Sequence, residues 1–166
     1  MNRSALIPWL LALALSYATA GIGALLTELG PWYDALRQPA WKPPDAAFGI
    51  VWSTIFTLCA ASGALAWRAA GTPALRLRVL VLFGVNALLN IFWSALYSKL
   101  HRPDWALAEV VLLWLSIVAL IVGLWRVSRW ASALLLPYLV WVSIASALNW
   151  ATVQLNGPFG PAGGAL

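Results

Sequence analysis

Aromatic and amide side chains recur at helical spacing in three apolar stretches of the sequence. The three stripes, with intervals of three or four residues, are Trp52–Phe56–Cys59–Gly63, Asn86–Asn90–Trp93–Tyr97 and Tyr138–Trp141–Ala145–Leu148. Large rings followed by a small residue leave room beside the rings. Asparagines in an apolar stretch need a polar cavity or a partner helix. The stripes predict an aromatic pocket for a flat apolar ligand, or alternatively a packed core held by asparagine hydrogen bonds.

Residue types for other kinds of chemistry are sparse. Cys59 and His101 are each the only residue of their type, and no His, Cys or carboxylate pair has metal-ligand spacing. The sequence has no Ser/His/Asp set and no glycine-rich phosphate loop, so we expect no metal, no cofactor and no ordinary acid–base catalysis. Glu109 is a candidate because carboxylates are costly within apolar spans. Its closeness to Asp104 favours a position near the membrane interface.

The elements that carry these residues are five apolar stretches, each long enough to cross a bilayer. A spanning helix needs roughly 20 mostly apolar residues, and 63% of the chain is hydrophobic while only 9% is charged. We expect spans over residues 5–27, 46–67, 77–98, 105–125 and 130–155. Their runs do not alternate as barrel strands do. The sequence predicts an all-α, multi-pass membrane protein, with one five-helix domain over residues 1–166.

The segments outside these spans also carry expectations. Residues 28–45 hold several prolines and three aromatics, which predicts a stiff lid over one end of the bundle. Pro137 is expected to bend the fifth span, and residues 157–166 to form a flexible tail. Ala18-Thr19-Ala20 resembles a signal-peptidase site. The apolar run continues through Leu26, which favours retention of residues 1–20 as part of the first span.

Basic residues lie in short clusters between the spans, and the net charge is +5. This distribution is typical of charges that flank a bilayer, and it excludes the one-sided basic surface of a nucleic-acid-binding protein. Six basic residues fall on the side of the N-terminus and four on the other side. The bias favours a cytoplasmic N-terminus.

Twelve tryptophans are an unusual number for this length. Five of them lie at span ends, where an indole reaches both lipid and water: Trp9, Trp67, Trp105, Trp125 and Trp130. Trp52, Trp93 and Trp141 lie further inside their spans. An indole N–H there needs a hydrogen-bond partner or a cavity.

These motifs resemble the TspO/MBR family of tryptophan-rich sensory proteins and mitochondrial translocator proteins. The matching strings, in family order, are Trp32-Tyr33-Asp34-Ala35-Leu36, Pro39-Ala40-Trp41-Lys42-Pro43-Pro44, Trp52, Asn90-Ile91-Phe92-Trp93, Trp105-Ala106-Leu107-Ala108-Glu109 and Pro137-Tyr138-Leu139-Val140-Trp141 leading to Leu148-Asn149. They cover about Gly21 to Asn156.

The resemblance implies five transmembrane helices, often in a homodimer, and a pocket at the end nearest residues 28–45. Ligands of the family are porphyrins, sterols and synthetic isoquinolines or benzodiazepines. Family pocket positions carry over to Tyr33, Trp41, Pro43, Trp52, Asn90, Trp93, Tyr138, Trp141, Ala145 and Leu148. In bacterial members the tryptophans matching Trp52 and Trp141 are linked to light-dependent porphyrin breakdown. Ala145 matches an alanine whose replacement by threonine alters ligand binding.

Two departures from the family pattern modify this expectation. Phe56 stands where some members have tyrosine. The stretch from Leu148 to Gln154 has no Lys or Arg, which the animal sterol motif requires, so strong sterol binding is not expected.

The leading hypothesis is a membrane receptor or carrier for tetrapyrroles such as protoporphyrin IX and haem, with sterol-like ligands as further candidates. The first alternative is an enzyme that degrades porphyrin in light, with Trp52 and Trp141 as its catalytic candidates. The second is a structural membrane protein that regulates partner proteins.

Overall fold

The computed structural model describes residues 3–159 of the chain, with side chains from Leu6 onward. Its elements in chain order are α1 (Arg3–Leu26), α2 (Pro31–Ala35), α3 (Asp45–Ala69), α4 (Pro73–Ser94), the π-helical turn η1 (Ala95–Lys99), α5 (Pro103–Trp125), α6 (Arg129–Ala133) and α7 (Leu136–Asn156). Within this part of the chain five stretches are long and apolar enough to span a bilayer, and no strand occurs. The predicted all-α membrane fold is therefore confirmed. Residues 160–166 of the predicted tail lie outside the described residues.

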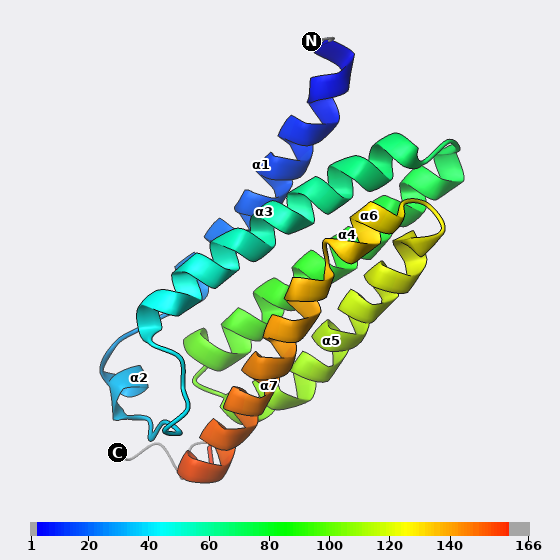
Figure 1. Cartoon of the computed structure of the whole chain (residues 1–166). Coiled ribbons are helices and arrows are strands. Elements are labelled where there is room, and N and C mark those ends of the chain that lie inside the picture. The colour runs from blue at the N-terminus through cyan, green and yellow to red at the C-terminus, as the bar shows by residue number, and fades with distance from the viewer. Residues whose placement is uncertain (1–2, 160–166) are drawn as a thin grey trace.

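The long helices lie side by side and alternate in direction (Figure 1). α1 packs against α3 and α4, α5 lies between α4 and α7, and the short α6 contacts both α3 and α5. Residues 27–44, which we call loop 1, gather with the end of α7 at one end of the bundle, the loop-1 end (Figure 1). The α3–α4 and α5–α6 connections form the opposite end of the bundle (Figure 1).

Prolines and small polar side chains set the starts of the helices. Proline lies in the first turn of α2, α4, α5 and α7, where its missing N–H has no intrahelical acceptor to lose. Thr72 and Ser128 cap α4 and α6 by accepting backbone N–H groups through their side chains. Pro137 lies next to an interruption of the fifth span, in keeping with the expected bend. It lies at the start of α7, and a turn at residues 134–135 separates α7 from α6.

The third span ends in a widened turn that the sequence did not indicate. The Leu100 N–H donates to the Ala95 carbonyl at 2.9 Å, an i to i+5 bond that defines the π-helical turn. His101 follows with φ of 52°, the left-handed conformation that often terminates a helix. Its ring stacks on Trp32 with centroids 4.2 Å apart, which fixes α2 against the end of this span.

Buried serines join helices at the end opposite loop 1. Ser62 Oγ donates to the Ala131 carbonyl and Ser132 Oγ to the Ile121 carbonyl, each at 2.7 Å. Both serines are fully buried beside an apolar cluster that includes Leu120, Leu124 and Leu135. Small side chains at these positions let α6 approach α3 and α5 closely.

Leu120→Ala tests whether this cluster holds the bundle together. Leu120 is fully buried, so truncation leaves a cavity and should cost about 2–5 kcal/mol of stability. Leu115→Ala on the same helix is the matched control, since Leu115 is 51% exposed on the lipid-facing side. Reversible unfolding in mixed micelles measures both. Equal losses for the two variants would contradict the assigned packing.

Candidate functional site

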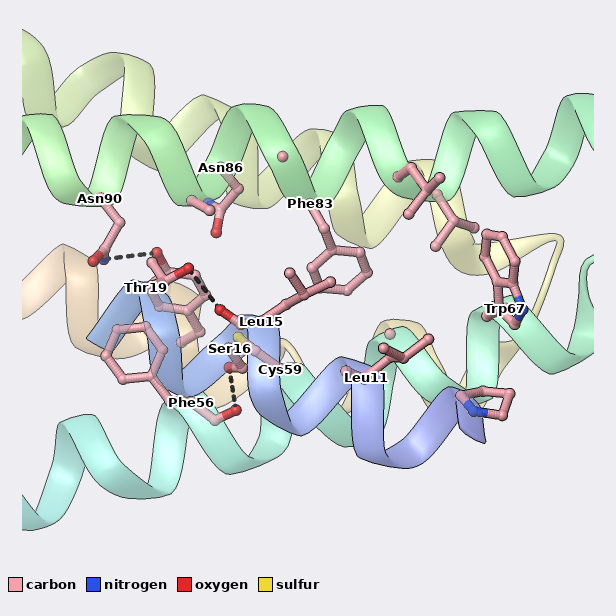
Figure 2. A pocket seen from close by; sticks show the side chains of 18 of the residues that line it. Leu11, Leu15, Ser16, Thr19, Phe56, Cys59, Trp67, Phe83, Asn86 and Asn90 are labelled. Atoms are coloured by element: carbon pink, nitrogen blue, oxygen red, sulfur yellow. Dashed lines mark hydrogen bonds between the residues drawn. The ribbon is translucent and has the colours of Figure 1, made fainter. Parts of the chain in front are cut away.

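A cavity lies between α1, α3 and α4, with one contribution from α7. Its volume is about 450 Å³, and its walls are mostly apolar. Figure 2 shows the α1 and α4 side chains facing each other across it, with Trp67 toward one end and Asn90 and Phe56 toward the other. The cavity thus runs from the end opposite loop 1 to the middle of the bundle. A space of this size falls in the range of small-molecule sites, about 300–1,000 Å³.

Hydrogen-bonding groups gather at the inner end of the cavity. Asn90 Nδ2 donates to Tyr138 Oη at 3.1 Å, and Asn86 Nδ2 donates to Ser116 Oγ at 2.8 Å. Asn86, Asn90 and Tyr138 are all buried, and all three line the cavity. In the hydrogen bonds found among the described residues both asparagines donate through Nδ2, and an amide oxygen can accept from a donor on a ligand.

The α1 wall of the cavity was not predicted as part of a site. Pro8, Ala12, Ser16 and Thr19 line it at intervals of four, four and three, so they form a stripe of small and polar residues on an otherwise leucine-rich helix. Ser16 Oγ donates to the Phe56 carbonyl at 2.6 Å and ties this stripe to α3 (Figure 2). This stripe is visible in the sequence and could have indicated that α1 lines a site.

Two glycines widen the cavity. A Cβ placed on Gly84 of α4 would meet no atom within 4 Å, whereas one on Gly63 of α3 would lie 3.8 Å from the Phe83 ring. Both glycines line the cavity. Their missing side chains contribute to the open space between α1 and α4.

Trp52 and Trp141, the central residues of the predicted site, lie next to this cavity and do not line it. Both pack against a core cluster that contains Ile55 and Ile117. The Trp141 ring meets the Phe48 ring edge-on at 5.4 Å. The Trp52 ring meets Tyr138 edge-on at 6.2 Å and stacks on Phe56 at 5.6 Å. Trp52 thus lies directly behind two residues of the cavity wall.

The remaining predicted site residues divide into three groups. Asn90 and Tyr138 line the cavity, whereas Trp93 and Tyr33 pack against a separate cluster at the loop-1 end that includes Leu96 and Tyr97. The others do not line the cavity: Trp41 is 53% exposed, Pro43 and Ala145 are half-buried, and Leu148 is buried. The cavity therefore brings together only two of the ten predicted residues.

Several buried polar groups have no hydrogen-bond partner among the described residues. They include the indole N–H groups of Trp93 and Trp141 and both carboxyl oxygens of Glu109. Glu109 is only 5% exposed, so it turns into the bundle and away from the solvated interface position favoured by its sequence. Buried polar atoms without partners are rare in proteins and point to an unseen acceptor or donor. Within residues 3–159 no group of three or more His, Cys, Asp or Glu side chains is placed to hold a metal.

Loop 1 is fastened across its end of the bundle. The Arg37 N–H donates to Asn156 Oδ1 at 2.7 Å, and Asn156 Nδ2 donates back to the Arg37 carbonyl at 2.9 Å. This pair of bonds joins loop 1 to the last residue of α7. With the Trp32–His101 stack, it holds loop 1 over the buried ends of α4, α5 and α7.

Comparison with known proteins gives consistent matches along most of the chain. The sequence model of the TspO/MBR family matches residues 10–155. Tryptophan-rich protein TspO of Chlorobaculum tepidum is 38% identical over 161 residues, which are 94% of this chain and 99% of that protein. Protein CrtK of Rhodobacter capsulatus is 34% identical over 84% of this chain and 87% of its own length. Human translocator protein is 30% identical over 75% of each chain.

Tyr138→Phe tests the polar end of the cavity. Removing the hydroxyl leaves the buried Asn90 amide without its acceptor, and we expect a loss of about 1–2 kcal/mol of stability. Tyr17→Phe is the matched control, because the Tyr17 hydroxyl pairs with Thr57 at an exposed position. Unfolding in mixed micelles should separate the two variants. An unchanged stability for Tyr138→Phe would reject the assigned hydrogen bond.

Proposed function

Because the chain belongs to the TspO/MBR family and is an integral membrane protein, we propose that it is a receptor or carrier for a flat, apolar tetrapyrrole such as protoporphyrin IX. The ligand enters the cavity between α1, α3 and α4. Haem and sterol-like molecules belong to the same class of flat apolar ligands. This activity requires recognition of a ring system and no reacting side chain.

The observation that carries this proposal is the composition of the cavity. Its walls are apolar along most of their length, and its polar groups are concentrated where Asn86, Asn90 and Tyr138 meet. Apolar walls favour the ring system by removing it from lipid and water, while a few fixed polar groups orient one edge of it. Asn90 and Tyr138 are the residues that would bind the polar edge of the tetrapyrrole.

The tryptophans have a defined place in this proposal. Trp52 contacts two cavity-lining rings, Phe56 and Tyr138, so a ligand that displaces Phe56 would meet the Trp52 face. The buried N–H groups of Trp93 and Trp141 have no acceptor among the residues described, but both residues lie outside the lining of the cavity.

The contact between Trp52 and Tyr138 also favours a second candidate function, light-dependent degradation of porphyrin. The ring centroids of Trp52 and Tyr138 are 6.2 Å apart. Because Tyr138 lines the cavity, this pair gives an excited porphyrin bound there a nearby electron donor. Illumination of the purified protein with protoporphyrin IX distinguishes the two functions. A new absorbing product that requires Trp52 and Trp141 would favour the enzyme, and slow bleaching that is equal in wild type and variants would favour the binder.

Trp141→Ala should weaken protoporphyrin IX binding by more than about tenfold, because Trp141 packs in the same core cluster as the cavity-lining Tyr138 and its loss would release that side chain. Trp150→Ala is the matched control on the same helix, because Trp150 is 57% exposed. Quenching of tryptophan fluorescence during titration gives both affinities. An unchanged affinity for Trp141→Ala would remove this residue from the site.

Gly84→Leu tests the cavity itself. A Cβ on Gly84 would meet no atom within 4 Å, so a leucine side chain would extend into the cavity without a clash. We expect protoporphyrin IX binding to fall by roughly tenfold or more without loss of stability. Gly21→Leu is the matched control: it is also a helical glycine with nothing within 4 Å, and it does not line the cavity. Equal affinities for the two variants would exclude the cavity as the binding site.

A further inference from the structure

The acidic residues of this protein are segregated at one end of the bundle. All five of them, Glu28, Asp34, Asp45, Asp104 and Glu109, belong to the loop-1 half, together with four basic residues. The opposite end carries six arginines and no acidic residue: Arg3, Arg68, Arg76, Arg78, Arg126 and Arg129. We call this the arginine end, and it comprises the start of α1 and the α3–α4 and α5–α6 connections (Figure 1).

Ion pairing follows the same division. The three ion pairs among the described side chains are Lys42–Asp45, Lys99–Glu28 and Arg102–Asp104, all at the loop-1 end. The Lys99 ammonium donates a hydrogen bond to Glu28 and lowers the pKa of that carboxyl below its ordinary value. The basic groups of this end are therefore largely neutralised by the protein itself. Among the described side chains, no ion pair occurs at the arginine end.

Tryptophan faces fix some of the guanidinium groups at the arginine end. The Arg76 guanidinium lies 5.2 Å from the centre of the Trp67 ring, and that of Arg129 lies 5.7 Å from the Trp125 ring. Cation–π contacts orient the guanidinium plane and leave its N–H edge able to donate. Exposed tryptophans are typical of the headgroup level of a bilayer. Trp125 and Trp130, at 53% and 79% exposed, place these arginines at that level.

One hollow at the arginine end is lined by arginines of the α5–α6 connection and of α6. Residues 125–129 line this hollow of about 400 Å³, which includes Arg126 and Arg129. Arg78 of α4 lies against Gly123, which has no side chain. A Cβ on Gly123 would lie 3.5 Å from Arg78 Nη2 and 2.8 Å from Leu82 Cδ1. Gly123 precedes Arg126 by three residues, a rise of about 4.5 Å along a helix.

We propose that the arginine end binds anionic phospholipids, with the headgroup phosphate held among Arg78, Arg126 and Arg129 beside Trp125. Guanidinium groups donate paired hydrogen bonds to phosphate oxygens. A neutral headgroup carries its own cation, so its phosphate binds these guanidinium groups less well than the phosphate of an anionic headgroup. The surface lies at headgroup depth and carries uncompensated positive charge. A bilayer leaflet rich in anionic lipid is therefore the partner that fits it. This inference does not depend on the tetrapyrrole proposal.

The test uses the full-length protein in neutral detergent, titrated with phosphatidylglycerol or with phosphatidylcholine of the same acyl chains. The variant Arg78→Gln/Arg126→Gln/Arg129→Gln should lose affinity for phosphatidylglycerol by roughly a hundredfold, the combined effect of three basic residues at an anionic surface. The matched control Lys42→Gln/Lys99→Gln/Arg102→Gln removes the same charge at the loop-1 end. It should retain the affinity, and native mass spectrometry counts the bound lipids in each case.

Two further measurements distinguish a lipid-binding surface from a site for free phosphate. The wild-type preference for phosphatidylglycerol should weaken as salt is raised, because exposed charges are screened. Inorganic phosphate at the same concentrations should give no comparable stabilisation in a thermal melt. A full response to phosphate alone would overturn the assignment to a lipid. Unchanged phosphatidylglycerol binding by the arginine variant, or equal loss in the control variant, would overturn the proposed surface.

Discussion

The centre of the bundle depends on two asparagines of α4 that must find hydrogen-bond partners away from water. Asn86 takes Ser116 of α5 and Asn90 takes Tyr138 of α7, so one helix is tied to two others at mid-height. In lipid there is no water to satisfy these amides, and separation of the helices would leave them exposed to hydrocarbon. The position of α4 relative to α5 and α7 follows from this requirement.

The cavity follows from how α1 joins this framework. α1 contacts α3, α4 and the turn η1. Among the residues described, no α1 side chain belongs to the three core clusters. Ser16 fastens it to α3, while the glycines and small residues that face α4 leave open space. The same amides that hold α4 in place therefore form the polar end of the cavity. Asn86, Asn90 and Tyr138 thus serve both the packing of the helices and the binding of a ligand.

The two ends of the bundle differ in how their polar groups are satisfied. At the loop-1 end, ion pairs and the Arg37–Asn156 hydrogen bonds neutralise charge and fasten a cover over the bundle. Close to this cover, buried groups such as the Trp141 N–H and the Glu109 carboxyl have no partner within the described part of the chain. At the arginine end the unmatched groups are exposed cations. These exposed cations suit a charged surface outside the bundle.

The sequence by itself determined the five long helices, the all-α membrane fold, the resemblance to the TspO/MBR family and the need of Asn86 and Asn90 for polar surroundings. Only the tertiary structure decided which partners those amides take, that α7 begins at Leu136 after a break, and that α1 forms a cavity wall. It also placed Trp141 inside a packed cluster that the cavity adjoins. The reason is physical: lipid is as apolar as leucine, so a spanning helix can be apolar all around. Hydrophobic periodicity then does not indicate which face meets which neighbour.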